Sequence, residues 1–85
     1  MKHAGPAALD DLHDVLAAIR RHASLRERRR GTFYLGVKAF LHFHEDRAGP
    51  FADVWTTDRW TRLRVATKRE RATLVRTVGR LLAEG

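Results

Sequence analysis

The sequence predicts an α+β fold with the order α-β-β-β-α: a two-layer sandwich in which both helices cover one face of a three-stranded antiparallel meander. In this chain of 85 residues, apolar side chains recur at helical spacing near both ends, over roughly 6–25 and 68–83. Between them, three segments at about 32–44, 51–56 and 60–66 show the period-two alternation of strands. The connections between these strands are too short for parallel crossovers, so the strands are expected to be antiparallel.

Both helices carry recognisable start signals within the single domain expected for residues 1–85. Residues 1–5 are expected to form a loose N-terminal tail. Pro6 suits the first turn of the helix at 6–25, where its missing N–H costs nothing. The basic run at 26–30 extends this helix or forms a loop, and Gly31 ends it. Thr67 and Glu70 fit a capping box at the start of the second helix.

The first strand, residues 32–44, has two different faces. Its odd positions are apolar throughout, whereas its even positions are largely aromatic, basic or imidazole-bearing. Side chains alternate between the two faces of a strand, so the odd positions are expected to face the core and the even positions to form an outer face. Gly36 is a weak point, because a bulge there would invert the facing of Tyr34 and Leu35 relative to the rest.

The turns set the register of the meander. The composition of residues 45–50 predicts a turn, and the register that pairs core with core makes three outer pairs: His44 with Phe51, His42 with Asp53, and Phe40 with Trp55. The turn at 57–59 leaves two registers open. A two-residue turn pairs Trp55 with Trp60 and Asp53 with Arg62, whereas a four-residue turn pairs Trp55 with Arg62 and Asp53 with Arg64.

In either register, the outer face gathers large aromatic and basic side chains. They are Tyr34, Lys38, Phe40, Trp55, Trp60, Arg62 and Arg64. A monomer rarely leaves a large apolar patch uncovered, so a partner is expected on this face. A second copy of the chain fits best, because Trp, Phe and Arg populate the centres of interfaces and a small domain gains most from such burial. Single-stranded nucleic acid is the alternative, with bases stacked on the aromatic rings and phosphates neutralised by the basic side chains.

A second alternative for the same face is a divalent-metal site formed by His42, His44 and Asp53. The two imidazoles lie two residues apart on a strand and project the same way, with the carboxylate opposite. A hydrogen-bonded His–Asp pair is the structural alternative. No other cofactor is expected. Nothing indicates an enzyme, because the chain has no cysteine, no phosphate-binding loop, and a single serine far from the histidines.

The composition indicates a basic cytoplasmic protein. The net charge is +7, which attracts polyanions and anionic surfaces. No cysteine is present to form disulfides. The short apolar stretch at 15–19 follows three aspartates, which is wrong for a signal peptide, and it is too short for a membrane span. No membrane partner is therefore expected.

One run of the sequence resembles a group of short, uncharacterised bacterial proteins with an F-L-H-F-H-x-D…A-D-[VL] core. The run comprises Gly31-Thr-Phe-Tyr34, Lys38-Ala-Phe-Leu-His-Phe-His-Glu-Asp46, Gly49 and Ala52-Asp-Val54, followed by Arg62, Arg64-Val and Thr67. The resemblance covers about the last two thirds of the chain and implies a bacterial cytoplasmic source without a mechanism. The G-T…V…L…H-E-D spacing over 31–46 is also similar to that of the larger MmcQ/YjbR-like domains. Neither resemblance carries over functional residues.

Overall fold

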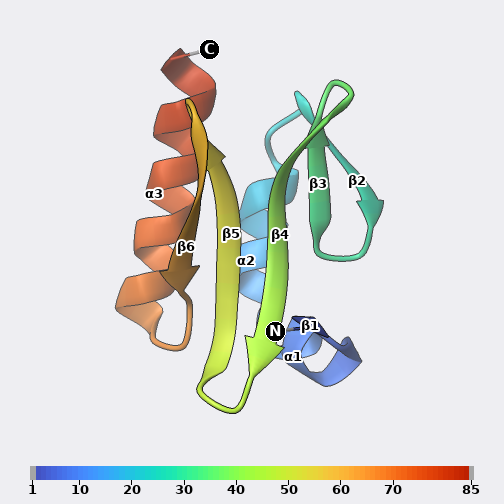
Figure 1. The fold of residues 1–85 in the computed structure, drawn as a ribbon, viewed down its shortest axis with the longest axis vertical. Coiled ribbons are helices and arrows are strands. Elements are labelled where there is room, and N and C mark those ends of the chain that lie inside the picture. The colour runs from blue at the N-terminus through green and yellow to red at the C-terminus, as the bar shows by residue number, and fades with distance from the viewer. Residues whose placement is uncertain (1, 85) are drawn as a thin grey trace.

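The computed structural model describes residues 2–84, which form an α+β fold with one six-stranded sheet and three helices. The strands are β1 (Lys2–His3), β2 (Leu25–Arg29), β3 (Thr32–Leu35), β4 (Lys38–Asp46), β5 (Gly49–Thr56) and β6 (Arg59–Arg64). The helices are α1 (Pro6–Asp11), α2 (His13–Arg20) and α3 (Lys68–Glu84). Helices α2 and α3 lie side by side behind the sheet, so one sheet face is covered and the other is not (Figure 1).

The sheet is larger than the sequence predicts. All pairings are antiparallel, and the strands follow the order β2-β3-β4-β5-β6, with β1 added to β4. The antiparallel meander is confirmed as β4-β5-β6, but a three-stranded sheet is wrong. The predicted N-terminal tail contributes β1, in which Lys2 pairs with Glu45 and His3 with His44. The basic run at 26–30 supplies most of β2, an edge strand whose charged side chains disfavour pairing with another chain.

The predicted first strand is in fact a hairpin of β3 and β4. Gly36 and Val37 form its two-residue turn, because Leu35 pairs with Lys38. Gly36 has a φ of 64°, the left-handed value that a type II′ turn needs at its first central position and that glycine adopts without strain. A two-residue turn places Leu35 and Lys38 on the same face, which reverses the odd–even pattern of the preceding strand.

A β-bulge at Phe40 reverses the pattern a second time. Phe33 pairs with Leu41 and Tyr34 with Ala39, so Phe40 is the extra residue on β4. The extra residue lets both Phe40 and Leu41 enter the core, where they are 4% and 0% exposed. Turn and bulge together restore the alternation, which explains why residues 32–44 read as one strand in the sequence.

The first predicted helix is also divided. It ends at Arg20 instead of residue 25, and it breaks at Leu12, where φ is −93° and ψ is 14°. The second helix is confirmed over Lys68–Glu84, with its capping box. Thr67 Oγ1 accepts a hydrogen bond from the Glu70 amide at 3.1 Å, and Glu70 Oε1 accepts one from the Thr67 amide at 3.0 Å.

The core lies between the sheet and the helices. Its fully buried side chains come from α2, the sheet, the residue after β6 and α3, and include Leu16, Ile19, Phe33, Leu41, Phe43, Val54, Val65, Leu74 and Val78. The predicted core positions Leu41, Phe43, Val54 and Val65 are confirmed, and Leu63 packs at the margin. None of the described helices has the length and apolar character that crossing a membrane requires.

Candidate functional site

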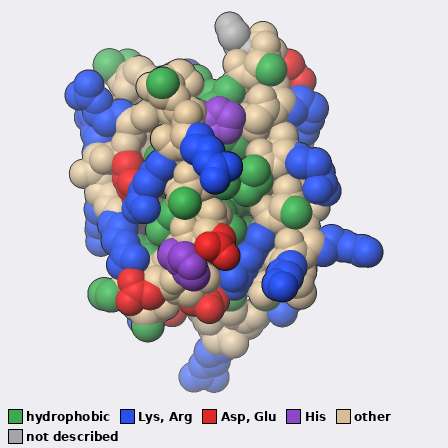
Figure 2. Space-filling view, turned by 180° about the vertical axis from the view of Figure 1, so that it is seen from behind, with side chains coloured by type: hydrophobic (Ala, Val, Ile, Leu, Met, Phe, Trp, Pro, Cys, Tyr) green, Lys and Arg blue, Asp and Glu red, His purple; other side chains and the backbone are tan. Residues whose placement is uncertain are grey.

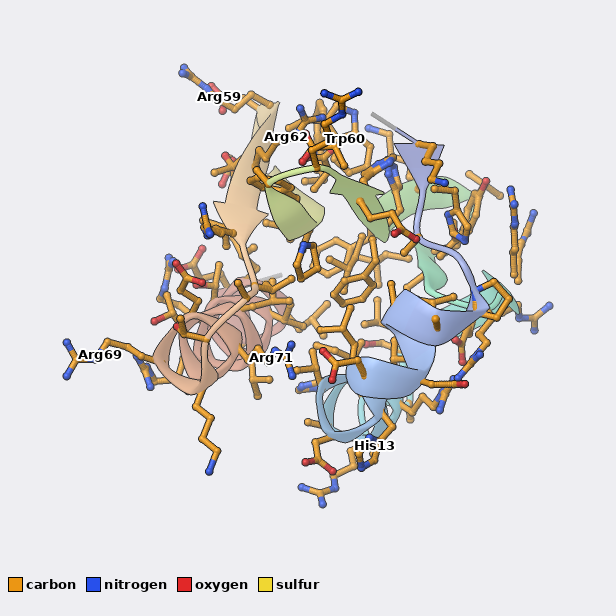
Figure 3. The ribbon with its side chains drawn as sticks, turned by 90° about the horizontal axis from the view of Figure 1, so that it is seen from below. His13, Arg59, Trp60, Arg62, Arg69 and Arg71 are labelled. Atoms are coloured by element: carbon orange, nitrogen blue, oxygen red, sulfur yellow. The ribbon has the colours of Figure 1, made fainter. Side chains whose placement is uncertain are left out.

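The candidate site is the uncovered sheet face, which we call the outer face. Strand alternation along β4, β5 and β6 places one set of side chains there: His42, His44, Phe51, Asp53, Trp55, Trp60, Arg62 and Arg64. In the view from below, Trp60 and Arg62 lie on the side of the sheet away from the helices, whereas His13 and Arg71 lie on the helix side (Figure 3).

Both predicted hairpin registers can be compared with the structure. His44 pairs with Phe51 and His42 with Asp53, as predicted. The second hairpin uses the two-residue turn, so Trp55 pairs with Trp60 and Asp53 with Arg62. The predicted pair of Phe40 with Trp55 is wrong, because the register of β4 and β5 ends at Leu41 and Val54 and the bulge turns Phe40 into the core.

The centre of the outer face is a cluster of two imidazoles, one carboxylate and one guanidinium. His42 Nδ1 lies 2.8 Å from His44 Nε2, and His44 Nε2 lies 3.2 Å from Asp53 Oδ2. Arg62 donates two hydrogen bonds to the same carboxylate, from Nε to Oδ1 at 2.8 Å and from Nη2 to Oδ2 at 3.0 Å. Such a two-pronged Arg–carboxylate contact fixes the orientation of both groups.

The cluster shifts the pKa of two of its members. Asp53 is only 8% exposed, and its pKa is lowered chiefly by the hydrogen bonds from Arg62, against the opposing effect of burial. The pKa of His42 is lowered mainly because burial disfavours the imidazolium, and further by the neighbouring His44. Neutral pH therefore leaves Asp53 ionised and His42 uncharged, with a lone pair available on one ring nitrogen.

One polar atom of the cluster is left without a partner among the described residues. Nδ1 of His44 is buried and has no hydrogen bond. Leaving a buried polar atom unsatisfied costs roughly 1–3 kcal/mol, and native proteins seldom tolerate it. The cluster is thus not arranged for stability alone, which marks it as a place to look for function.

Aromatic rings surround the cluster. The ring of His42 lies 4.6 Å from that of Trp60, and Trp60 meets Trp55 edge to face at 5.5 Å. The Lys38 ammonium lies 5.6 Å from the centre of the Trp55 ring, within cation–π range. Tyr34 lies further along the sheet, with the Arg28 guanidinium 4.6 Å above its ring. Each contact restricts the motion of a ring that would otherwise be free in solvent.

The predicted outer residues are thus brought together with two exceptions, Lys38 and Phe40. Trp60 borders the cluster through His42, and Trp55 contacts Trp60. Arg64 lies one outward position beyond Arg62 on β6, with its Nε 3.9 Å from Glu70 Oε2. Lys38 pairs with Leu35 and shares its face, although its ammonium reaches the ring of Trp55. Phe40 does not belong to the outer face. It instead lines a cleft of about 380 Å³ where β4 and β5 part, together with Leu35, Trp55, Thr57, Leu81 and Glu84.

Three features of this region are not predicted from the sequence. His3 lies opposite His44, so a third imidazole borders the cluster from β1. Arg28 covers Tyr34. The tip of the β3–β4 hairpin exposes Leu35 and Val37, at 42% and 88%. A glycine at the first of two central positions, as in Gly36-Val37, is the signal that could have indicated this hairpin.

Comparisons of the chain with protein-family models, with curated proteins and with solved structures find no match. The two resemblances described above therefore stay predictions. The chemistry of the outer face has to be inferred from its own residues. It offers two imidazole nitrogens, a fixed carboxylate, a half-exposed indole and several cations. These groups are suited to binding.

Proposed function

We propose that the protein binds single-stranded nucleic acid through the outer face. The observation that carries this proposal is the position of Trp60. Trp60 is 42% exposed, and Arg62 shares the outer side of β6 with it. An exposed indole next to a guanidinium is the combination that stacks an unpaired base and contacts the adjoining phosphate.

The indole is held in place before a ligand arrives. His42 contacts its ring at 4.6 Å, and Trp55 contacts it edge to face at 5.5 Å. Aromatic contacts of this kind contribute about 0.5–1.5 kcal/mol each beyond burial. A base that stacks on Trp60 therefore meets a ring whose freedom is already restricted, which lowers the entropy cost of binding.

The charges support an anionic ligand. The chain carries a net charge of +7. The side chains of Arg62 and Arg64 are 51% and 52% exposed even though each lies near a carboxylate. Lys38 and Arg28 add two further cations above the rings of Trp55 and Tyr34. A polyanion that follows the sheet would meet this series of positive groups beside the aromatic rings.

A fluorescence-anisotropy titration with a labelled oligothymidylate, at several salt concentrations, tests the proposal. Stacking is worth about 1–3 kcal/mol per base, so Trp60→Ala should weaken binding by about 5- to 150-fold and leave the salt slope unchanged. Trp60→Phe should retain most of the affinity. Arg64→Ala should reduce the salt slope by about 0.7, the value for one phosphate contact on a single strand.

The matched control is Arg69→Ala, which removes the same charge from α3 on the other side of the sheet (Figure 3). It should leave both the stacking contribution and the salt slope of the outer face in place. Equal affinity for a duplex, or full affinity in Trp60→Ala, would show attraction by charge alone and would defeat the proposal.

Self-association is the second candidate. It is favoured by a line of apolar groups: Leu35 and Trp55 share the cleft, Trp55 contacts Trp60, and Val37 is 88% exposed beside them. The burial of Phe40 leaves a smaller aromatic surface than the sequence predicts, which places this candidate second. Light scattering on a size-exclusion column decides it: a mass of two chains that Trp60→Ala reduces to one would support it, and a single-chain mass at micromolar concentration would exclude it.

A further inference from the structure

We propose that His42, His44 and Asp53 bind one divalent transition-metal cation of the zinc class. This inference is independent of nucleic-acid binding and would stand if that proposal failed. Each residue offers one ligand atom, and the three atoms lie within 4.8 Å of one another. Two imidazole nitrogens and one carboxylate oxygen are a donor set that zinc and its neighbours accept.

The close approach of the two imidazoles carries the proposal. His42 Nδ1 and His44 Nε2 lie 2.8 Å apart. One proton shared between the two nitrogens makes this contact a hydrogen bond, and a cation can take the place of that proton. In a tetrahedral zinc site with Zn–N bonds of about 2.0–2.1 Å, two ligating nitrogens lie about 3.3 Å apart. The rings therefore need to separate by only about half an ångström to admit the ion.

The third ligand atom lies close to one of the two imidazoles, and all three lie within 4.8 Å of one another. Asp53 Oδ2 lies 3.2 Å from His44 Nε2, already close to the separation of two ligands in a tetrahedral site. His42 and Asp53 are direct partners in the β4–β5 pair, and His44 follows two residues along the same strand. All three side chains therefore leave the same face of a paired, central part of the sheet, which holds their geometry.

Arg62 supports the carboxylate from outside the ligand set. Its two hydrogen bonds, at 2.8 and 3.0 Å, fix the plane of Asp53, as outer partners of metal ligands commonly do. The positive charge of Arg62 also repels the metal ion and lowers its affinity. The metal is therefore expected to exchange with solution and to be lost during purification.

The donor set selects the kind of metal. Imidazole nitrogen is a poor ligand for Mg²⁺ and Ca²⁺, which require oxygen ligands, and a good one for Zn²⁺, Ni²⁺ and Cu²⁺. Three protein ligands leave one tetrahedral position open. A water molecule or an oxygen of an anionic ligand would occupy that position, on the solvent side of the sheet.

Isothermal titration calorimetry with ZnCl₂, on the full chain without a histidine tag, tests the site. We expect one equivalent to bind, and MgCl₂ to give no binding heat. Loss of even an outer partner commonly costs about 10- to 100-fold in metal affinity, so His42→Gln should lose at least that much. The matched control is His13→Gln, because His13 lies on α2 on the far side of the sheet and should leave binding unchanged (Figure 3).

A second measurement reads the site directly. Because the His42 ring lies 4.6 Å from Trp60, one equivalent of Cu²⁺ should quench the tryptophan fluorescence of the wild-type chain and of His13→Gln, but not of His42→Gln. NMR avoids any dependence on the folding of a variant: Zn²⁺ should shift the imidazole resonances of His42 and His44 and spare those of His13. Absence of zinc binding by the wild-type chain, or wild-type affinity in folded His42→Gln, would overturn the proposal.

Discussion

The two faces of the β4–β5 pair place neighbouring residues in opposite surroundings. On the helix side, Leu41, Phe43 and Val54 are fully buried in the hydrophobic core. On the outer side, His42 is hydrogen-bonded to His44. Asp53 accepts two hydrogen bonds from Arg62 and lies 3.2 Å from His44. The inner face gains stability from burial that has no directional requirement. On the outer face, hydrogen bonds between the polar groups fix the orientation of the side chains.

The difference is visible from the helix side as well. Figure 2 shows apolar side chains in the middle of this face, among some charged ones and histidines, and basic side chains along both margins of the molecule. Positive charge is therefore not confined to the outer face. What distinguishes the outer face is the combination of charge with a half-exposed indole and paired imidazoles, which the helix side lacks among the residues described.

The largest expected effect on stability is at Phe40, because the bulge places its side chain on the inner face instead of the outer face. A buried Phe→Ala change costs about 3–5 kcal/mol, and Phe40→Ala should approach that loss in free energy of unfolding. Trp60→Ala should cost about 1 kcal/mol, the value of its aromatic contacts. Urea unfolding followed by circular dichroism measures both.

Phe40→Leu keeps the test informative where the alanine variant does not fold, because it leaves most of the apolar volume in place. It should lose less stability than Phe40→Ala and remain less stable than the wild-type chain. If Phe40→Ala costs no more than Trp60→Ala, the Phe40 ring lies on the outer face and the bulge is assigned to the wrong residue.

The sequence predicts the faces of β4 better than it predicts the path of the chain. Leu41 and Phe43 are inward and His42 and His44 outward, as alternation requires. The sequence pattern does not reveal the hairpin at Gly36, because the bulge at Phe40 restores the period-two alternation that the turn reverses. Period-two alternation shows only which side chains share a face. The turn and the bulge each reverse the facing, so together they leave the pattern unchanged.

Other misses have different physical causes. The two-residue strand β1 is too short to show a period, and tertiary pairing with Glu45 and His44 places it. The basic run in β2 has weak strand propensity, and Glu27 holds it by accepting hydrogen bonds from Arg20 at 2.6 Å and 3.0 Å. By contrast, the histidine cluster is correctly predicted, because one strand and one cross-strand neighbour define it without long-range information.

Substituting alanine for two different glycines should change the free energy of unfolding in opposite directions, by an amount smaller than that expected for Phe40→Ala. Gly36→Ala meets no atom within 4 Å, but its φ of 64° is left-handed, so it should destabilise the chain by about 1–2 kcal/mol. Gly79→Ala also meets no atom within 4 Å and lies inside α3, so it should stabilise by about 0.8–1 kcal/mol. Thermal unfolding of both variants reads the difference. A neutral Gly36→Ala would argue against the tight turn that sets the facing of β4.

The smallest expected effect is a pH dependence that only the outer face should produce. The pKa of His42 is lowered in the fold by burial and by His44, with Asp53 partly opposing. Unfolding therefore takes up a proton at mildly acidic pH. Stability should fall as the pH drops below about 6.5, the ordinary histidine value, towards the lower pKa of the folded state.

The test compares melting temperatures between about pH 7 and pH 5, a window around the ordinary histidine pKa, with a chelator present to keep metal away. The pKa of Asp53 is lowered as well, so its stabilising effect is lost only when the pH falls below about 4, outside this window. His42→Gln should therefore flatten the pH dependence, and His13→Gln should leave it unchanged. An equally steep dependence in His42→Gln would mean that another group titrates on unfolding, and the imidazole of His42 would then be as accessible to protons in the fold as in the unfolded chain.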